Sequence, residues 1–354
     1  MNTIRLYAWS CDFKSNTGEG VLCQDFCKTF SREKKVFIKL LSPEISAEIF
    51  KSNIKVKKKI RITNLKLLHY IYPYLGVLYL WFQFFSGKKV MYLNYLPLWN
   101  FVILFLLPPK TLLGPITGGG QIQKNKKSNF IRKYLFPKFY QISLKILDIR
   151  QKKILFSTDL LKKFIKKKIL DNFLFLFCLN IIDSYRKIKI KEKKEIDLLF
   201  YYNNHPHKFK PRILKLINKL ANKNIKVCCV GERFPNKKII YLGRIDRPKL
   251  QKIIKNSKLT FISAENYLSL YILDSIMLNL KIFVSVNEFS YLNHYFFKDN
   301  FLKYNSLSSD EKLIKYIISN LKKYKLNNSQ KTFKNNVKKI NKKNINYFSN
   351  LLIK

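Results

Sequence analysis

The first half of the chain alternates short apolar runs with helix-length segments that separate them. Strands are predicted at Ile4–Trp9, Val36–Leu41, Lys89–Leu93, Thr111–Leu113 and Ile154–Ser157. Gly18 and Gly20 open one of the intervening helices, which continues through Phe30. Strands separated by helix-length segments indicate a parallel sheet that is covered by helices on both faces.

A second pattern of the same kind begins after residues 186–194, whose sequence RKIKIKEKK has little to bury. Strands are predicted at Asp197–Tyr202, Lys226–Val230, Ile239–Leu242, Leu259–Ser263 and Ile282–Val286. Helical spacing of apolar residues is found at Ile213–Asn224, Lys249–Ser257, Leu268–Asn279, Leu313–Leu321 and Phe333–Leu351.

The two patterns predict an α/β chain with two Rossmann-like, doubly wound parallel-sheet domains that face each other across a cleft. The expected limits are 1–185 for the N-terminal domain, 186–194 for a charged hinge, 195–325 for the C-terminal domain, and 326–354 for a C-terminal helix that packs back toward the N-terminal domain. Ligands of open parallel sheets bind beyond the carboxyl ends of the strands, so the residues that follow each strand are the candidates for chemistry.

Two long apolar stretches, His69–Phe85 and Met91–Pro108, raise the question of membrane insertion. A spanning helix needs about 20 mainly apolar residues, and these stretches are interrupted by Pro73, Asn94, Pro97 and Asn100. Helices and strands of a buried core are therefore the favoured interpretation. The alternative is an aromatic-rich face that rests on a membrane, because a basic run, Lys55–Arg61, lies close by in the sequence.

The composition supports folded domains and a polyanionic partner. The chain has 354 residues, which leaves room for two domains, and its hydrophobic content of 47% excludes intrinsic disorder. Its formal net charge is +48. Of the 69 basic residues 59 are Lys and 10 are Arg, a bias that an AT-rich genome produces at tolerant positions. Nucleic acid, anionic lipid and phosphate-bearing ligands are all compatible with this charge.

The cysteines and the first residues bear on the compartment. The 6 cysteines have neither the spacing of a zinc site nor the pattern of a secreted disulfide framework. The opening sequence MNTIRLYAWSCDF lacks the basic start and the uninterrupted apolar run of a signal peptide. We therefore expect buried free thiols, no bound metal and a cytoplasmic protein.

Two glycine-bearing segments follow strands of the first half. Gly18 and Gly20 suit a simple turn, a dinucleotide site or a loop that closes over a sugar or phosphate, because glycines at a helix start let the backbone approach an anion. Cys23 occupies the third glycine position of a dinucleotide fingerprint. In the segment GPITGGG, Gly118 and Gly119 favour the close approach of a ligand over a bare turn.

The segment YYNNHPHK follows the first strand of the second half. Lys208 can neutralise a diphosphate, and Asn203 can donate a hydrogen bond to it. His205 and His207 offer a metal site as the alternative, but no carboxylate accompanies them closely enough.

The segment SAENYLSLYILD runs from a later strand into a helix. Glu265 can hold sugar hydroxyls and Asp274 can hold a ribose, while free amides at the helix start, near Ser269 and Leu270, suit a phosphate. The plain alternative is that both carboxylates serve only the helix start and the surface.

The order and spacing of these segments resemble the GT-B-fold glycosyltransferases, in particular the group 1 (family 4) retaining enzymes. The likeness is carried by DLLFYYNNHPHK, KVCCVGE, IIYLGRIDRPKLQKIIKNSKLTFISAE and LDSIMLNLKIFVS, and GPITGGG and the Gly18 to Gly20 loop fit in position. It implies transfer of a sugar from a nucleotide diphosphate sugar, bound mainly to the C-terminal domain, to a glycan or lipid-linked acceptor, as in cell-surface polysaccharide or lipopolysaccharide synthesis. It also implies retention of the anomeric configuration, with no cofactor and no metal.

The resemblance gives each candidate residue a role. It implies Lys208 at the diphosphate and Glu265 at the sugar as catalytic residues. The donor-binding residues that it implies are Asp274 at the ribose, with Asn203, Asn266, Ser269, Leu270, Gly18, Gly20, Gly118 and Gly119.

Several positions depart from the family pattern. The family's first and second glutamates fall on Asn266 and Asp274, with Glu265 one position early, and its diphosphate-binding arginine falls on Asn203. The histidine that many members place near the reacting sugar has no counterpart in the first half. A non-catalytic GT-B-like scaffold is therefore one alternative to an enzyme.

A basic nucleic-acid-binding protein is the other alternative. It is disfavoured because the lysines are spread along the chain and Arg, the usual base reader, is scarce. We expect no nucleic-acid partner. We expect instead that the basic, aromatic N-terminal half lies on the anionic cytoplasmic face of a membrane.

Overall fold

The computed structural model describes most of the chain, which divides into two compact units. The N-terminal unit is Met1–Ile181 with Lys338–Lys354, and the C-terminal unit is Ile182–Val337. The described residues are 3–13, 18–34, 36–60, 68–93, 96–114, 116–117, 134–150, 154–156, 173–175, 194–203, 211–261, 269–286 and 301–324, with the single positions Asn335, Lys342 and Asn346. Apart from Lys194 and those single positions, the predicted hinge and C-terminal helix lie outside them.

The N-terminal unit is built on a six-stranded sheet with β1 (Ile4–Trp9) inside it. β1 pairs in parallel with β2 (Val36–Leu41) and β5 (Lys89–Tyr92), and β5 pairs in parallel with β7 (Leu112–Leu113). These strands lie where the hydrophobic pattern predicted them. A four-stranded parallel sheet has the order β10 (Phe173–Phe175), β9 (Ile154–Phe156), β8 (Ile116–Thr117), β6 (Leu96–Pro97).

An antiparallel hairpin that the hydrophobic pattern did not predict lies at one edge of the six-stranded sheet and is formed by β3 (Ile45–Phe50) and β4 (Asn53–Lys59). Its turn residues Lys51 and Ser52 have φ of 47° and 69°, a conformation that usually takes Asn or Gly, so the turn has no sequence signature. It is held instead by α1 (Gly18–Lys34), because the Ser52 amide donates to Ser31 Oγ at 3.1 Å. The lysines of β4 keep this edge charged, which discourages pairing with another chain.

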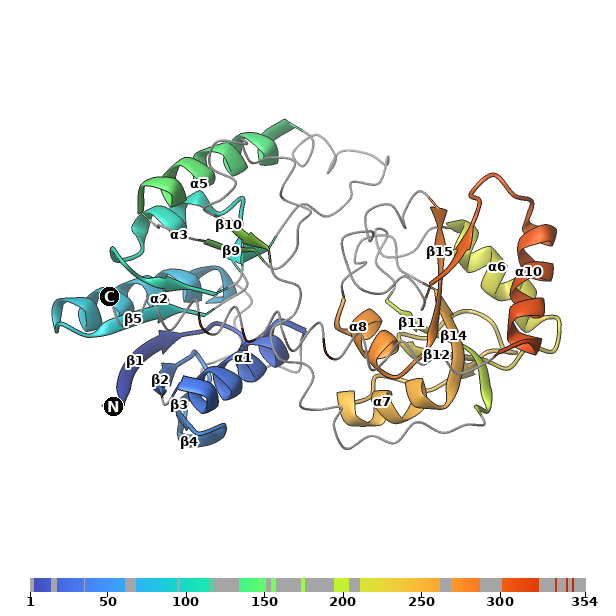
Figure 1. Ribbon diagram of the computed structural model, residues 1–354, viewed down its shortest axis with the longest axis horizontal. Helices are drawn as coiled ribbons and strands as arrows, with labels where there is room; N and C mark the ends of the chain where they lie inside the picture. The colour runs from blue at the N-terminus through green and yellow to red at the C-terminus, as the bar shows by residue number, and fades with distance from the viewer. Residues whose placement is uncertain are drawn as a thin grey trace. The chain divides into compact units, whose positions relative to one another are not determined.

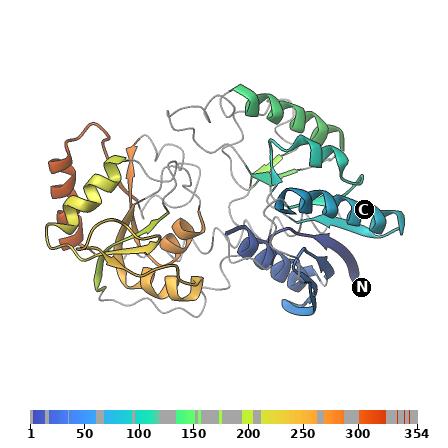
Figure 2. The ribbon, with the colours of Figure 1, turned by 180° about the vertical axis from the view of Figure 1, so that it is seen from behind.

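Helices cover both faces of the six-stranded sheet (Figures 1 and 2). Parallel strands require this because both of their faces are apolar. On one face α1 buries Cys23, Phe26, Cys27 and Phe30. On the other face α2 (Leu68–Phe85), α3 (Phe101–Leu106) and α5 (Phe136–Arg150) share a core that includes Leu80, Ile103 and Leu144.

The two long apolar stretches are divided between these elements. The first is α2, which continues through Pro73, and the second contains β5, β6 and α3. One face of α2 and α3 is buried, as predicted, but large apolar side chains such as Leu78 and Phe82 are exposed on the other. Within the part of the chain that the structure describes, no helix has the length and hydropathy needed to cross a bilayer.

The C-terminal unit has a parallel six-stranded sheet with the order β13-β12-β11-β14-β15-β16. Its strands are β11 (Ile196–Tyr202), β12 (Val227–Gly231), β13 (Ile240–Tyr241), β14 (Ser257–Phe261), β15 (Lys281–Ser285) and β16 (Phe301–Tyr304). All but β16 were predicted. The buried thiol of Cys229 in β12 has its pKa raised to about 12 by burial, as expected of a structural cysteine.

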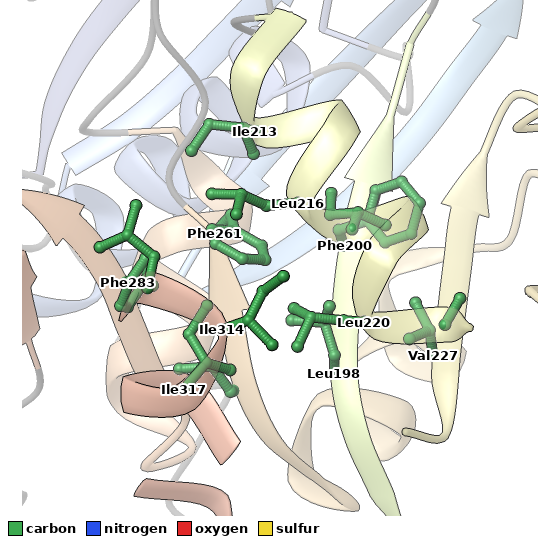
Figure 3. Packing of buried hydrophobic residues seen from close by; sticks show 14 of the residues in the cluster. Leu198, Phe200, Ile213, Leu216, Leu220, Val227, Phe261, Phe283, Ile314 and Ile317 are labelled. Carbon is green, nitrogen blue, oxygen red and sulfur yellow. The ribbon is translucent and has the colours of Figure 1, made fainter. Parts of the chain in front are cut away.

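Among the described residues of this unit, four helices flank the sheet, and all four overlap predicted helices. α6 (Pro211–Ala221) and α10 (Asp310–Lys322) pack on one face over a core that includes Phe200, Leu216 and Ile317 (Figure 3). α7 (Arg247–Lys255) and α8 (Leu270–Met277) lie on the other face (Figure 1). The two units thus confirm the predicted α/β class with Rossmann-like sheets.

Lys194 has a buried side chain just before β11. Its side chain is 5% exposed, its Nζ donates to the Asn279 carbonyl at 3.0 Å, and it lies 5.1 Å from the centre of the Tyr324 ring. Burial, aided by the charge of Lys281, lowers the pKa of Lys194 to about 7. The folded unit therefore favours the neutral amine, whereas the unfolded chain keeps an ordinary lysine.

This difference predicts that stability rises with pH. Between about pH 7 and about pH 10 the unfolded state binds more protons at Lys194 than the folded state, so the free energy of unfolding should increase by at most about 1.4 kcal/mol per pH unit. Urea titrations of the wild type and Lys194→Met across this range measure the effect. The variant should lose that rise, and an equal slope in both proteins would contradict the assignment.

Candidate functional site

The strand order of the C-terminal unit places a binding edge between β11 and β14. From β11 the chain first builds β12 and β13 on one side and then crosses over to build β14, β15 and β16 on the other. This reversal is the topological switch point at which open parallel sheets bind ligands, beyond the carboxyl ends of the strands. Asn203 directly follows β11 at this edge.

α8 carries the second group of predicted residues to the same edge. Ser269 caps the helix, and its Oγ accepts a hydrogen bond from the Ile272 amide at 3.2 Å. The preceding amides, those of Leu270 and Tyr271, have no intrahelical acceptor because they belong to the first turn. Such amides, at the positive end of the helix dipole, favour an anion such as a phosphate.

Tyr271 fixes this first turn against the sheet. Its hydroxyl lies 2.9 Å from Thr260 Oγ1 in β14 and donates to the Leu199 carbonyl in β11 at 3.2 Å. Burial raises the pKa of Tyr271 well above its usual value. The ring centres of Tyr201 and Tyr271 are 6.0 Å apart, so the start of α8 lies beside the end of β11.

Asp274 lies one turn further along α8 and is engaged in a buried ion pair. Its carboxylate is 1% exposed, and it accepts hydrogen bonds from Arg247 Nε at 3.1 Å and Arg247 Nη2 at 3.0 Å. Arg247 is the first residue of α7, whose cap is Asp246. The pair therefore joins the start of α7 to α8 with the bidentate geometry that guanidinium and carboxylate favour.

The neighbouring strand ends are held by backbone contacts around Gly231. The φ of Gly231 is +106°, and a Cβ at this position would lie 2.2 Å from the Tyr202 carbonyl oxygen. Next to it, the Glu232 amide donates to that same carbonyl at 2.9 Å, and Glu232 Oε1 pairs with Arg244 Nη2 at 2.9 Å. The ends of β11 and β12 are thus held together beside the switch point.

The structure brings some of the predicted residues together and leaves others undescribed. Asn203, Ser269, Leu270 and Asp274 belong to one edge of the C-terminal unit. Gly18 and Gly20 begin α1, which follows β1 in the N-terminal unit. The predicted residues that lie outside the described ranges are Lys208, Glu265, Asn266, Gly118 and Gly119. Their roles remain predictions.

Three residues at this edge were missed by the sequence analysis: Tyr271, Arg247 and Glu232. Glu232 and Tyr271 could have been found from their positions just after a strand and at a helix start. The sequence feature that points to Arg247 is weaker: it is an Arg directly after the helix-capping Asp246, in a chain whose basic residues are mostly Lys. Across the described residues, no group of three His, Cys, Asp or Glu side chains is placed to hold a metal ion.

Two Rossmann-like units in one chain, with a ligand edge at the switch point of the second, define the GT-B fold. No protein-family model and no curated protein matches the sequence. Solved structures do match it. HepE from Anabaena, in complex with UDP, has a TM-score of 0.59 and 10% identity, covering 99% of this chain and 100% of that one.

Two further structures agree. Sucrose-phosphate synthase from Thermosynechococcus elongatus has a TM-score of 0.57 and 11% identity, covering 99% of this chain and 98% of that one. A glycosyltransferase from Rickettsia africae has a TM-score of 0.56 and 14% identity, covering 99% of each chain. These neighbours are GT-B glycosyltransferases, which confirms the predicted fold, while the assignment to family 4 stays a prediction.

The backbone at Gly231 gives a stability prediction with an internal control. Gly231→Ala should destabilise the C-terminal unit by about 2 to 4 kcal/mol, because the new Cβ meets the Tyr202 carbonyl and the φ is unfavourable. Gly243→Ala, at φ +73° with nothing within 4 Å of the new Cβ, should cost only the backbone term of about 1 to 2 kcal/mol. Urea unfolding measures both, and equal losses would show that the contact with Tyr202 is relieved.

The Arg247 and Asp274 pair gives a double-variant prediction. Asp274→Leu alone should cost about 3 to 5 kcal/mol, because it leaves the largely buried Arg247 without its counter-charge. The double variant Asp274→Leu with Arg247→Met should recover part of that loss, since no uncompensated charge remains. Chemical denaturation of the wild type, the two single variants Asp274→Leu and Arg247→Met, and the double variant measures the coupling between the two residues. Strictly additive losses would contradict the coupling.

Proposed function

We propose that the chain is a glycosyltransferase that moves a sugar from a nucleotide diphosphate sugar to a glycan or lipid-linked acceptor. The observation that carries the proposal is the edge of the C-terminal unit, where the start of α8 is bonded to β11 and β14 at the switch point. Support comes from HepE, which shares the fold over nearly the whole length and has been solved with UDP and with UDP-glucose.

The donor diphosphate is assigned to the start of α8. The amides of Leu270 and Tyr271 suit phosphate oxygens, and the two hydrogen bonds of Tyr271 hold them in place before the ligand binds. Lys208 and Asn203 follow β11 and complete the diphosphate site in this proposal. Anchoring of this kind lowers the cost of ordering the site when the donor binds.

The sugar and the ribose are assigned to the other polar residues of this region. Glu265, with Asn266 beside it, is proposed to hold the sugar hydroxyls. Asp274 is proposed to serve the ribose. Its carboxylate is 1% exposed and paired with Arg247, so the proposal requires this side chain to become accessible when the donor binds. Arg247 then fixes the orientation of the carboxylate.

The proposed chemistry is the departure of the nucleoside diphosphate as its bond to the anomeric carbon breaks. The negative charge that grows on the leaving phosphate is stabilised by the Lys208 ammonium and by the first-turn amides of α8. Fixed cationic and amide donors can supply this stabilisation without a metal ion, and metal-independent, retaining transfer is part of the proposal.

The acceptor is assigned to the N-terminal unit. Gly18 and Gly20 at the start of α1, with Gly118 and Gly119, keep the donor-binding role that the resemblance implies. Glycines let a backbone approach a sugar or phosphate closely. We assign the enzyme to cell-surface polysaccharide or lipopolysaccharide synthesis, as a cytoplasmic protein that associates peripherally with the inner face of the cell membrane.

A non-catalytic donor-binding scaffold is the second candidate. It is favoured by Asn266 and Asn203, which stand where the resembling enzymes have Glu and Arg. Donor hydrolysis or transfer separates the two, because a scaffold binds the nucleotide sugar and leaves it intact.

The donor assignment predicts a thermal shift. A screen of UDP-, GDP-, ADP- and CMP-sugars should find a donor that raises the Tm of the wild type, because a ligand that binds only the folded state stabilises it. Lys208→Ala should lower the affinity for that donor by about tenfold or more, as expected for a lost charge-assisted contact to phosphate.

Lys223→Ala is the matched control, because Lys223 is an exposed lysine just after α6. It should leave the shift unchanged. If none of the donors raises the Tm, the assignment of a donor site is wrong. If Lys208→Ala and Lys223→Ala change the donor affinity equally, Lys208 does not belong to the site.

A further inference from the structure

The outer face of α2 is apolar, although it is directed away from the core. Tyr70, Tyr74, Leu78, Phe82 and Phe85 follow one another at the spacing of a single helical stripe and are all exposed, Leu78 by 66% and Phe82 by 68%. No charged residue occurs between Tyr70 and Phe85. A surface helix of a water-soluble domain normally carries polar residues on this side.

The neighbouring helices extend the same surface. Phe105 of α3 and Ile149 of α5 are exposed as well, the latter by 86%. We call these residues, with Tyr74, Leu78, Phe82 and Phe85, the outer apolar face. Figure 1 shows α2, α3 and α5 together on one side of the N-terminal unit, opposite α1.

The three helices hold this face as one surface. Their inner sides share a core, and Trp81 Nε1 donates to the Leu106 carbonyl at 2.7 Å. The Arg150 guanidinium of α5 donates to the Phe105 and Leu107 carbonyls at the end of α3. The exposed side chains therefore project from helices that are packed on one another, and exposed apolar side chains grouped in this way mark an interaction site.

The charge around the outer apolar face indicates what covers it. α2 and α3 contain no Asp or Glu, and an exposed lysine follows each of them, Lys89 after α2 and Lys110 after α3, while α5 carries one exposed acid, Asp148. Exposed Lys138 and Lys145 lie on α5 itself. A second copy would bring the same positive charge against it, and a nucleic acid offers phosphates, not an apolar surface.

We propose that the outer apolar face docks on an anionic lipid bilayer, inserting its aromatic and aliphatic side chains at the level of the head groups while the surrounding lysines contact lipid phosphates. This combination of an apolar face and a basic rim is that of a protein lying in the membrane interface. The inference identifies the docking surface for the peripheral association in the proposed function, but it rests on the N-terminal unit and needs no donor binding.

Flotation with lipid vesicles tests the proposal on the full chain. The wild type should float with phosphatidylcholine vesicles that contain about 30% phosphatidylglycerol at about 0.1 M salt, and less with phosphatidylcholine alone. Phe82→Glu should lower the partition coefficient at least about tenfold, because it places a charge where an apolar ring enters the interface.

Leu307→Glu is the matched control, since Leu307 is 90% exposed in the C-terminal unit. It should float as the wild type does. A donor-induced thermal shift that is the same in Phe82→Glu and in the wild type shows that the variant is folded. If no donor binds any protein, the circular-dichroism melt supplies that check, and the flotation result stands without the proposed function.

Three results would overturn the proposal. The first is no flotation with the anionic vesicles at either low or high salt. The second is equal flotation of Phe82→Glu and the wild type. The third is a dimer in sedimentation that Phe82→Glu dissociates, which would assign the face to a second copy of the chain.

Discussion

Parallel strands with two apolar faces require cover on both sides, and the arrangement of each unit depends on this constraint. In the C-terminal unit α6 and α10 cover one face and α7 and α8 the other. α6, α7 and α10 turn polar residues to solvent, whereas the described residues of α8 are mostly buried. In the N-terminal unit the cover is α1 on one face and α2, α3 and α5 on the other. In this unit the need to cover the sheet explains why the inner sides of the helices are apolar. It does not explain the apolar outer side of α2, which we attribute to a partner.

The strands could be predicted because their apolar runs are short and bounded by polar residues, as in Ile4–Trp9 and Asp197–Tyr202. The β3–β4 hairpin could not, because its turn uses Lys51 and Ser52 with positive φ and depends on a contact with α1. The order of the strands was enough to place Asn203, Ser269 and Leu270 at one sheet edge. The pairing of Arg247 with Asp274, 27 positions apart, depends on how α7 packs beside α8, which no local pattern encodes.

Lysine and arginine have different structural roles in this chain. Lysines are abundant and mostly carry solvated charge, whereas several of the 10 arginines make contacts that need a planar fork. Arg247 grips a buried carboxylate, Arg150 bonds two carbonyls at the end of α3, and Arg212 joins Asp310 to the turn before α10. A composition that replaced Arg by Lys wherever this was tolerated would leave Arg at such positions, so scarcity makes each remaining Arg informative.

The buried amine of Lys194 has a chemical consequence. An acylating reagent reaches exposed lysines directly, whereas Lys194 is 5% exposed and reacts only when its surroundings open. Its acylation rate therefore reports how often the contacts among β11, Asn279 and Tyr324 are broken. Among the 59 lysines of the chain, the labelling rate of Lys194 would therefore measure how often this part of the C-terminal unit opens.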